Sequence, residues 1–290
     1  MKITGVTIIK DAIKNDYPIV EAITSILPLV DEMVVSIGQS DDGTEDLIKS
    51  IISKKIKIFY SQWDLSLRKG GVVLAVETNK ALMHVSNDTD WVFYIQGDEV
   101  LHEKYHENIL TAAKKYFNNP KVLGLLFNFV HFYATYNYVG DSRRWYNKEV
   151  RIIRHNKNIQ AYKDAQGFRL SNKKIAVKQI DACINHYGWV KSPTQMIAKQ
   201  KNVSQFWNED TDEWRNYLEI EDLYNFNDFD SLVKFTGTHP VVMEKRVKAQ
   251  QWTLDIDISK KKFTLKEKLL YWFEKKTGVR LFDFKNYKKI

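Results

Sequence analysis

The chain has 290 residues, of which 44% are hydrophobic and 28% are charged, and its formal net charge is +8. This composition is typical of a globular protein with a sizeable core and excludes disordered and fibrous classes. The sequence has no apolar run of the roughly 20 residues that span a bilayer, no visible signal peptide, and a single cysteine, Cys183. We therefore expect a cytoplasmic protein without an intrachain disulfide, in which Cys183 is a buried thiol.

The first part of the chain alternates between strand-like and helix-like segments. The predicted strands cover residues 4–10, 33–37, 55–60 and 91–95, and the predicted helices cover 17–27, 45–52, 72–85 and 104–117. This order is typical of βα units and of a mostly parallel sheet. Such a sheet binds its ligand at the carboxyl ends of its strands, where the polar segments 10–11, 39–44 and 96–99 should converge.

The segment from Trp91 to Val100 contains five consecutive apolar residues and then Gly97, Asp98 and Glu99. An uninterrupted apolar run predicts a strand that is buried on both faces. Carboxylates at the end of such a strand suit Mg²⁺ or Mn²⁺, which bind oxygen ligands alongside substrate phosphates. The alternative is an acidic helix N-terminus. The expected convergence with the other polar strand ends favours a metal site.

The middle of the chain favours longer strands, which we expect to be antiparallel additions to the sheet. They are predicted over residues 122–130, 133–139, 150–155 and 173–177, with His131 as a satisfied core or groove histidine. Arg151 and Arg154 are interpreted as solvated sheet-edge charges. Trp145, Trp189 and Trp207 are interpreted as core residues rather than sugar-stacking ones.

The remainder of the chain predicts helices. Ser192-Pro193-Thr194-Gln195 is a capping box with proline at the first helical position, and it follows His186 closely. Residues 204–232 are expected to form short helices and loops. We divide the chain into a catalytic domain (1–190), a helical and loop extension on the acceptor side (191–259) and a tail (260–290).

The positive charge lies in the tail. Residues 260–290 hold eleven Lys or Arg and three Asp or Glu, so the rest of the chain has 33 basic and 33 acidic side chains. Within the predicted helix 263–277, one apolar stripe contains Leu265, Leu269, Trp272 and Phe273. A basic amphipathic helix predicts contact with an anionic membrane surface. The alternative is a docked C-terminal helix with solvated lysines. Because no base-reading motif accompanies the charge, nucleic acid is not an expected partner.

Four short motifs, in this order, resemble family 2 glycosyltransferases with the GT-A fold, and most closely their lipopolysaccharide and capsule branch. The motifs are Ser40-Asp41-Asp42-Gly43-Thr44, Thr78-Asn79-Lys80-Ala81-Leu82, Gly97-Asp98-Glu99 and His186-Tyr187. The resemblance covers residues 1 to about 200. It implies an α/β, Rossmann-like nucleotide-sugar-binding domain with a mostly parallel sheet, antiparallel additions and C-terminal helices.

The resemblance also implies an activity. The enzyme would transfer a sugar, with inversion and with Mg²⁺ or Mn²⁺, from a nucleotide-sugar donor to a saccharide or lipid-linked acceptor in surface polysaccharide or lipopolysaccharide biosynthesis. It would be cytoplasmic, or peripheral on the inner face of the membrane. An alternative enzyme of related fold is a sugar-nucleotide nucleotidyltransferase, but residues 7–14 lack the glycine-rich phosphate loop that such enzymes carry.

Site residues follow from the same resemblance. Asp98, Glu99 and His186 match metal ligands, and Asp164 lies where inverting members place the catalytic base. The donor-binding positions are Lys10, Asp11, Asp42, Asn79 and Gln96. Two departures stand out: Gln96 replaces the first acid of the metal motif, and Ser36-Ile37-Gly38 replaces the acid that reads the nucleotide base. The metal would therefore have fewer charged ligands, and the identity of the nucleotide base is left open.

Overall fold

The computed structural model describes residues 1–220, 224–254, 256–259 and 261–290. Its strands are β1 (Ile3–Ile9), β2 (Glu32–Gly38), β3 (Ile56–Ser61), β4 (Trp91–Tyr94), β5 (Glu99–Leu101), β6 (Gly124–Ala134), β7 (Tyr138–Gly140), β8 (Lys148–Arg154), β9 (Ile159–Tyr162), β10 (Gly167–Leu170), β11 (Lys173–Lys174), β12 (Ala176–Val190), β13 (Leu232–Lys234) and β14 (Lys288–Lys289). Its α-helices are α1 (Ile19–Ile26), α2 (Thr44–Lys49), α3 (Val72–Leu82), α4 (His106–Tyr116), α5 (Pro193–Ser204), α6 (Asp212–Leu218), α7 (Glu244–Lys248) and α8 (Leu265–Thr277).

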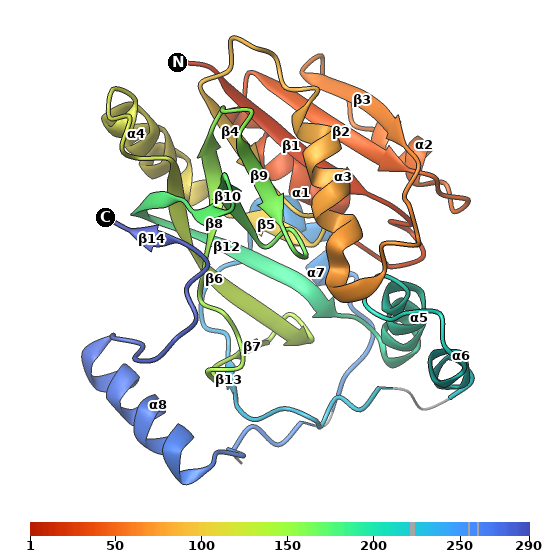
Figure 1. Cartoon of the computed structure of the whole chain (residues 1–290). Coiled ribbons are helices and arrows are strands. Elements are labelled where there is room, and N and C mark those ends of the chain that lie inside the picture. Colours follow the sequence, from red (N-terminus) through yellow and green to blue (C-terminus); the bar gives the residue numbers. More distant parts are fainter. Residues whose placement is uncertain (221–223, 255, 260) are drawn as a thin grey trace.

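The large sheet has the order β13-β7-β6-β8-β4-β1-β2-β3, and β12 pairs with β6 and β5 (Figure 1). Strands β3, β2, β1 and β4 are parallel neighbours. Strand β8 then runs antiparallel between β4 and β6, and β12 is parallel to β6 but antiparallel to β5. The predicted fold class, a parallel α/β half with antiparallel additions and C-terminal helices, is confirmed.

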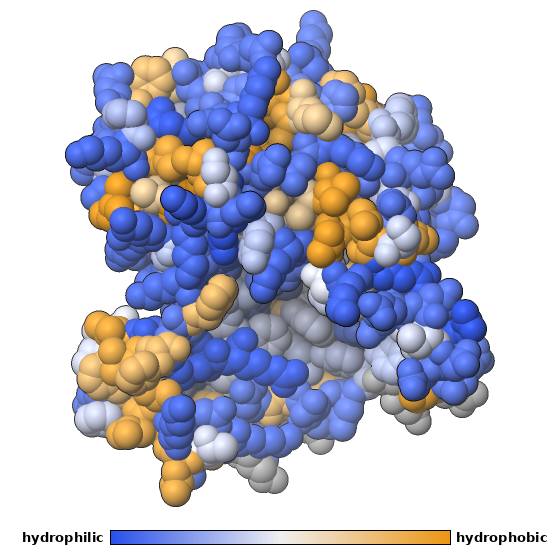
Figure 2. Space-filling model, viewed as in Figure 1, coloured by the Kyte–Doolittle hydropathy of each residue, from blue (hydrophilic) through white to orange (hydrophobic). Residues whose placement is uncertain are grey.

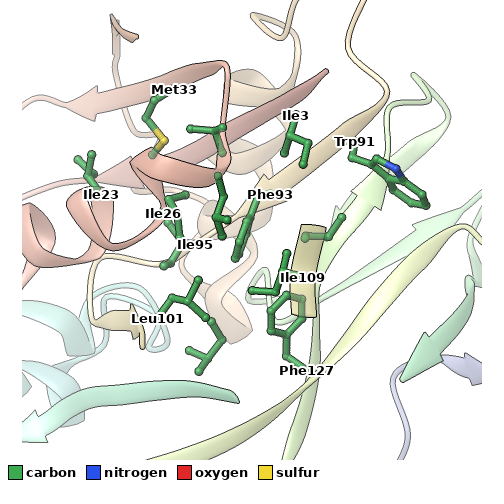
Figure 3. Close-up of a cluster of buried hydrophobic side chains, with 14 of the residues drawn as sticks. Ile3, Ile23, Ile26, Met33, Trp91, Phe93, Ile95, Leu101, Ile109 and Phe127 are labelled. Atoms are coloured by element: carbon green, nitrogen blue, oxygen red, sulfur yellow. The ribbon is translucent and has the colours of Figure 1, made fainter. Parts of the chain in front are cut away.

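Both faces of β1, β2 and β4 are buried, whereas the edge strand β3 is only partly covered, and alternate residues of each strand point to opposite faces. In β4, Trp91 and Phe93 pack with α1 and α4, whereas Val92 and Tyr94 pack with α3 and the β9–β10 hairpin. Figure 3 shows Phe93 among side chains from α1, α4 and β6. A strand covered on both sides has no polar face, which explains the uninterrupted apolar run of its sequence.

Only the start of strand β12 was predicted, although it is the longest strand of the described residues. Its pairing with β6 has register shifts between Gln179 and Cys183 and between His186 and Trp189. Each irregularity changes which residues face the core, so the sequence loses the two-residue period that identifies a strand. The sequence prediction ended this strand at residue 177, before most of β12.

The C-terminal segment returns to the body after α8. Strand β14 pairs with the start of β12, and Tyr287 is buried beside it. Helix α8 begins with a capping box at Thr264 and ends at Gly278, which has a left-handed backbone (φ 69°). Within the described residues, no helix has the length and hydrophobicity needed to cross a membrane.

Candidate active site

A cavity of about 600 Å³ opens at the carboxyl ends of β1 and β4. Its lining includes Lys10, Gln96, Asp98, His186 and Lys199, with Asp164 from the β9–β10 turn. The volume is in the range of small-molecule and cofactor sites, and the position is where open α/β sheets bind ligands. The structure thus brings five of the sequence-predicted site residues (Lys10, Gln96, Asp98, Asp164 and His186) into one cavity.

A reversal of the chain after β4 places Asp98 beside β12. In the pairing of β5 with β12, Glu99 is opposite His186, and the Asp98 carbonyl accepts a hydrogen bond from the Tyr187 amide at 2.8 Å. The approach requires glycine at position 188, because a Cβ there would lie 2.4 Å from Asp98 Oδ2 and 2.9 Å from His186 Cε1. The Asp98 and His186 side chains meet above this glycine.

Two histidines form a chain of contacts that ends at Asp98. His131 Nε2 is 2.7 Å from the Tyr146 carbonyl, which can only accept, so this nitrogen carries a proton. Burial, with His186 nearby, keeps the pKa of His131 well below its usual value, so its other nitrogen, Nδ1, is an acceptor. His186 Nδ1 lies 3.3 Å from it and donates. His186 Nε2 therefore faces Asp98 Oδ2, at 3.4 Å.

Lys199 on α5 adds positive charge to this pair. Its ammonium lies 3.7 Å from Asp98 Oδ2 and donates to the Gly188 carbonyl at 2.8 Å. Burial alone would raise the pKa of Asp98, but the adjacent His186, Lys199 and Lys191 outweigh it and lower the pKa below its usual value. Asp98 is therefore a carboxylate that positions basic groups, and a cation could bind it only together with the negative charge of a substrate.

The residues fit a divalent cation that also binds phosphate oxygens. Asp98 Oδ2 and His186 Nε2 converge, and His186 presents Nε2 because its other nitrogen is engaged by His131, an arrangement common among metal-bound histidines. Among the described residues there is no group of three or more His, Cys, Asp or Glu arranged to hold a metal. A cation here would therefore need ligands from the substrate, as Mg²⁺ usually does.

Asp164 is a second carboxylate at the cavity, in the tight turn between β9 and β10. Its neighbours Lys163 and Ala165 both have positive φ, 55° and 60°, so the turn holds a fixed and unusual backbone. Burial raises the pKa of Asp164 above its usual value. A carboxylate with a raised pKa is a better proton acceptor, which suits a general base.

Aromatic side chains form another wall of the cavity. Trp189 stacks on Tyr224 with ring centroids 6.1 Å apart, and Trp145 meets Trp189 edge-on, also at 6.1 Å. Both tryptophans are half-buried, and Trp207, which is exposed, also borders the cavity. Trp145 and Trp189 pack against a buried hydrophobic cluster, in line with their interpretation as core residues, but all three rings also line the cavity.

No protein-family model and no curated protein matches this chain. Three solved structures illustrate its structural likenesses. An N-terminal fragment of TarS from S. aureus is 14% identical over 78% of this chain and 72% of that one, with a TM-score of 0.35. A 4-diphosphocytidyl-2C-methyl-D-erythritol synthase from Anaerococcus prevotii is 12% identical over 68% and 94%, with a TM-score of 0.41. Glucosyl-3-phosphoglycerate synthase from Mycobacterium tuberculosis, solved with Mn²⁺ and UDP, is 20% identical over 45% and 44%, with a TM-score of 0.31. At these values the function has to be argued from the site itself.

Glu99 does not reach the cavity, which corrects its assignment as a metal ligand. Its carboxylate accepts from Arg151 at 2.7 Å and 2.5 Å, and both side chains are fully buried. One oxygen also accepts from the Gln96 amide at 3.1 Å. Arg151 is likewise no solvated edge charge. The two residues form a buried, two-pronged ion pair beneath the turn that carries Asp98.

Two predicted donor-binding residues, Asp42 and Asn79, have structural roles outside the main cavity. Asp42 accepts hydrogen bonds from the backbone of Ile13, Lys14 and Thr44, so it joins the loop after β1 to the start of α2. The Asn79 side chain pairs with the backbone of Ala161, at 2.7 Å and 3.4 Å, and fixes α3 against β9. The structure does not bring either side chain to Asp98.

Asp11 lies behind Lys10 at the end of β1. It is buried, and one carboxylate oxygen pairs with the Lys10 ammonium at 3.2 Å. The other oxygen has no hydrogen-bond partner. Asp11 does not line the cavity, so its contact with a donor would pass through Lys10, which does.

Sequence reasoning missed Lys199. The capping box at Ser192 predicts the helix that carries it, and Met196 and Val203 mark the helix face that packs inward. Lys199 falls on that face, three residues after Met196 and four before Val203. A lysine on the buried stripe of an amphipathic helix is the signal that could have found it.

Proposed function

We propose that this protein is a glycosyltransferase that moves a sugar from a nucleotide-sugar donor to a saccharide or lipid-linked acceptor in surface polysaccharide or lipopolysaccharide biosynthesis. The single observation that carries the proposal is the cavity, in which a carboxylate among basic groups on one side lies together with a second carboxylate and an aromatic wall. Asp98, His186 and Lys199 form the first side, and Asp164 provides the second carboxylate. Transfer from a diphosphate leaving group requires both functions.

The donor diphosphate would lie against the first side. Lys199 and Lys10 line the cavity and would offer ammonium groups to the phosphates, and hydrogen bonds between such charged groups are strong. A divalent Mg²⁺ or Mn²⁺ held by Asp98 and His186 would offset the charge that develops on the departing diphosphate. Gln96, which borders the cavity, can hydrogen-bond the donor without adding charge.

The transfer step needs a proton acceptor. The acceptor hydroxyl oxygen forms a bond to the anomeric carbon, while the bond from that carbon to the phosphate oxygen breaks and its electron pair leaves with the diphosphate. Asp164 takes the hydroxyl proton. Attack from the face opposite the leaving group inverts the anomeric configuration. The aromatic wall of Trp145, Trp189 and Trp207 gives sugar rings a stacking surface during this step.

The test measures, with and without Mn²⁺, whether UDP-sugars release UDP, GDP-sugars release GDP and CMP-sugars release CMP. We expect one donor to be turned over, and Asp164→Asn to lower kcat about 10²- to 10⁴-fold with little change in donor affinity, because a general base contributes that much. The matched control is Asp181→Asn, which removes an exposed carboxylate on β12. Turnover of no donor by the wild type contradicts the proposal; unchanged kcat in Asp164→Asn contradicts the role of Asp164 alone.

The same assay distinguishes a glycosyltransferase from the alternative, a sugar-nucleotide nucleotidyltransferase. That enzyme would consume a nucleoside triphosphate and a sugar phosphate and release pyrophosphate. The nucleotidyltransferase alternative would replace the transferase proposal if such a pair released pyrophosphate and no nucleotide sugar reacted with an acceptor.

A further inference from the structure

We propose that α8 and the segment that follows it form a docking surface for an anionic lipid bilayer. This inference does not depend on the proposed function. It concerns residues 264–285, which we call the C-terminal platform. Figure 1 places α8 at the edge of the molecule, and Figure 2 shows hydrophobic residues gathered over it.

One side of α8 is fixed to the body by polar contacts. Tyr271 donates to Asp141, and the Lys275 ammonium pairs with the same carboxylate. Glu274 accepts from Arg143 at 2.9 Å. Burial opposes the charged form of Asp141, but the hydrogen bonds from Lys275 and Tyr271 outweigh it and lower the pKa of Asp141. These contacts fix which side of the helix faces outward.

The outward side of α8 is apolar. Leu265, Leu269 and Trp272 are 85%, 65% and 57% exposed, and their spacing places them on one stripe of the helix. A docked C-terminal helix would normally turn such a stripe to the core. Here the polar residues hold the helix to the body, and the apolar residues are left to solvent.

The apolar surface continues beyond the helix. Phe282 is 89% exposed and Phe284 76%, and Val279 is exposed as well. Phe282 has φ 55°, a conformation that side-chain-bearing residues adopt at a cost. The chain is then fixed again, because Asn286 accepts from Arg169 and Tyr287 is buried. The exposed rings therefore belong to a segment that is held at both ends.

Charge identifies the occupant of this surface. Lys266, Lys268, Lys276 and Lys285 are exposed around the apolar residues, and residues 260–290 carry a net +8 while the rest of the chain is neutral. A second copy of the chain would bring the same +8 against it and be repelled. An anionic bilayer attracts each lysine near its surface, and its interface accommodates Trp and Phe beside Lys.

The experiment is co-sedimentation of the full chain with vesicles of phosphatidylcholine, with or without 30% phosphatidylglycerol. We expect the chain to bind the anionic vesicles at least 10-fold more tightly than the neutral ones. This binding should decrease as the salt concentration is raised. The apolar variant is L265S/L269S/W272S. Its matched control, I52S/M83S/V241S, removes three other exposed apolar residues. We expect the first variant to lose binding at least 10-fold and the control to bind as the wild type.

A second pair of variants tests the charge. K266E/K268E/K276E should abolish binding, whereas K54E/K121E/K157E, which changes the net charge equally at exposed lysines elsewhere, should leave most of it. The melting temperature of each variant shows that it folds. Failure of the wild type to bind anionic vesicles, or equal loss in a platform variant and its control, overturns the proposal. A dimer in solution that L265S/L269S/W272S dissociates would also overturn it, in favour of a second copy. Because no nucleotide is present, none of these outcomes bears on the proposed transferase activity.

Discussion

The hydrogen bonds of His131 decide which atom of His186 faces Asp98. The Tyr146 carbonyl fixes the proton of His131 on Nε2, and His131 Nδ1 then takes the hydrogen bond of His186 Nδ1. His186 Nε2 can either carry a proton toward Asp98 or give its lone pair to a cation. Because a metal ligand must be unprotonated at the binding atom, only the form of His186 with its proton on Nδ1 could offer Nε2 to a cation.

The His131 contact can be tested by substitution. We expect His131→Phe to weaken the affinity for Mn²⁺ about 10- to 100-fold in the presence of the bound nucleotide, the usual effect of losing an outer hydrogen-bond partner of a ligand. His131→Asn should retain much of the affinity, because its amide oxygen can accept from His186. Electron paramagnetic resonance of free Mn²⁺ measures both. Wild-type affinity in His131→Phe would show that the contact does not orient His186.

Glu149 is a buried acid that the proposed chemistry does not use. It lies on β8 beside Arg151, and one of its oxygens has no hydrogen-bond partner. Burial raises the pKa of Glu149 from 4.5 to about 8, despite the opposing effect of Arg151. Between these two values the folded protein binds a proton that the unfolded chain has lost. The contribution of Glu149 to the free energy of unfolding is therefore largest below pH 4.5 and decreases as the pH rises toward 8.

Glu149→Gln isolates this effect, because the amide resembles the protonated acid. We expect the free energy of unfolding of the variant, relative to the wild type, to rise with pH between 4.5 and 8, by at most about 1.4 kcal/mol per pH unit. Urea unfolding at several pH values measures the difference. A difference that stays constant across this range would mean that Glu149 is ionised in the folded protein.

At the scale of elements, the strands with two buried faces were the predictable ones. β1, β2 and β4 are buried on both sides, so their sequences are mostly apolar and are followed by polar residues. β12 could not be predicted in the same way. Its bulges shift the pattern, and its exposed and buried positions do not alternate regularly. As a result, His186 was expected near a helix, whereas it lies within a strand.

Helices α5 and α8 begin with the same kind of capping box but have different relations to the cavity. Ser192 caps α5, which carries Lys199 to Asp98, whereas Thr264 caps α8, which lies outside the cavity. Each cap contributes about 1 kcal/mol to its helix. Loss of the first should disturb the cavity, and loss of the second should not.

Ser192→Ala and Thr264→Ala form a matched pair for this comparison. We expect Ser192→Ala to lower the melting temperature by about 2–4 °C and to reduce the additional stabilisation given by the bound nucleotide. Thr264→Ala should leave the nucleotide effect at its wild-type size. Differential scanning fluorimetry with and without nucleotide measures both quantities. Equal stabilisation by the nucleotide in the two variants would show that α5 does not contribute to donor binding.

At the scale of the whole molecule, the sequence predicted which strand ends are polar but not which side chains turn toward one another. Asp98 and His186 were predicted and do meet, because β5 and β12 pair beside the end of β4. Glu99 was predicted as a ligand from its position next to Asp98. Asp98 belongs to the turn after β4, whereas Glu99 begins β5, and the Glu99 side chain points to Arg151. Such partners come from distant segments, so local sequence does not reveal them.

The sequence predicted that the positive charge lies in the C-terminal tail, but not how the tail contacts the rest of the molecule. The tail was expected either to lie on a membrane or to dock on the body. The structure shows docking through Asp141 and β14 together with an exposed apolar stripe. The two alternatives are therefore compatible, because one face of the segment contacts the body and another face is exposed.

In the proposed mechanism, Asp98 binds a nucleotide donor through a divalent cation. Calorimetric titration of UDP, GDP and CMP, each with and without Mn²⁺, into the wild type, Asp98→Asn and the exposed control Asp46→Asn tests it directly. We predict that one nucleotide binds the wild type and the control about 10-fold or more tightly with Mn²⁺ than without, and that Asp98→Asn loses this gain. Binding of no nucleotide by the wild type, or an undiminished Mn²⁺ effect in Asp98→Asn, would contradict the claim.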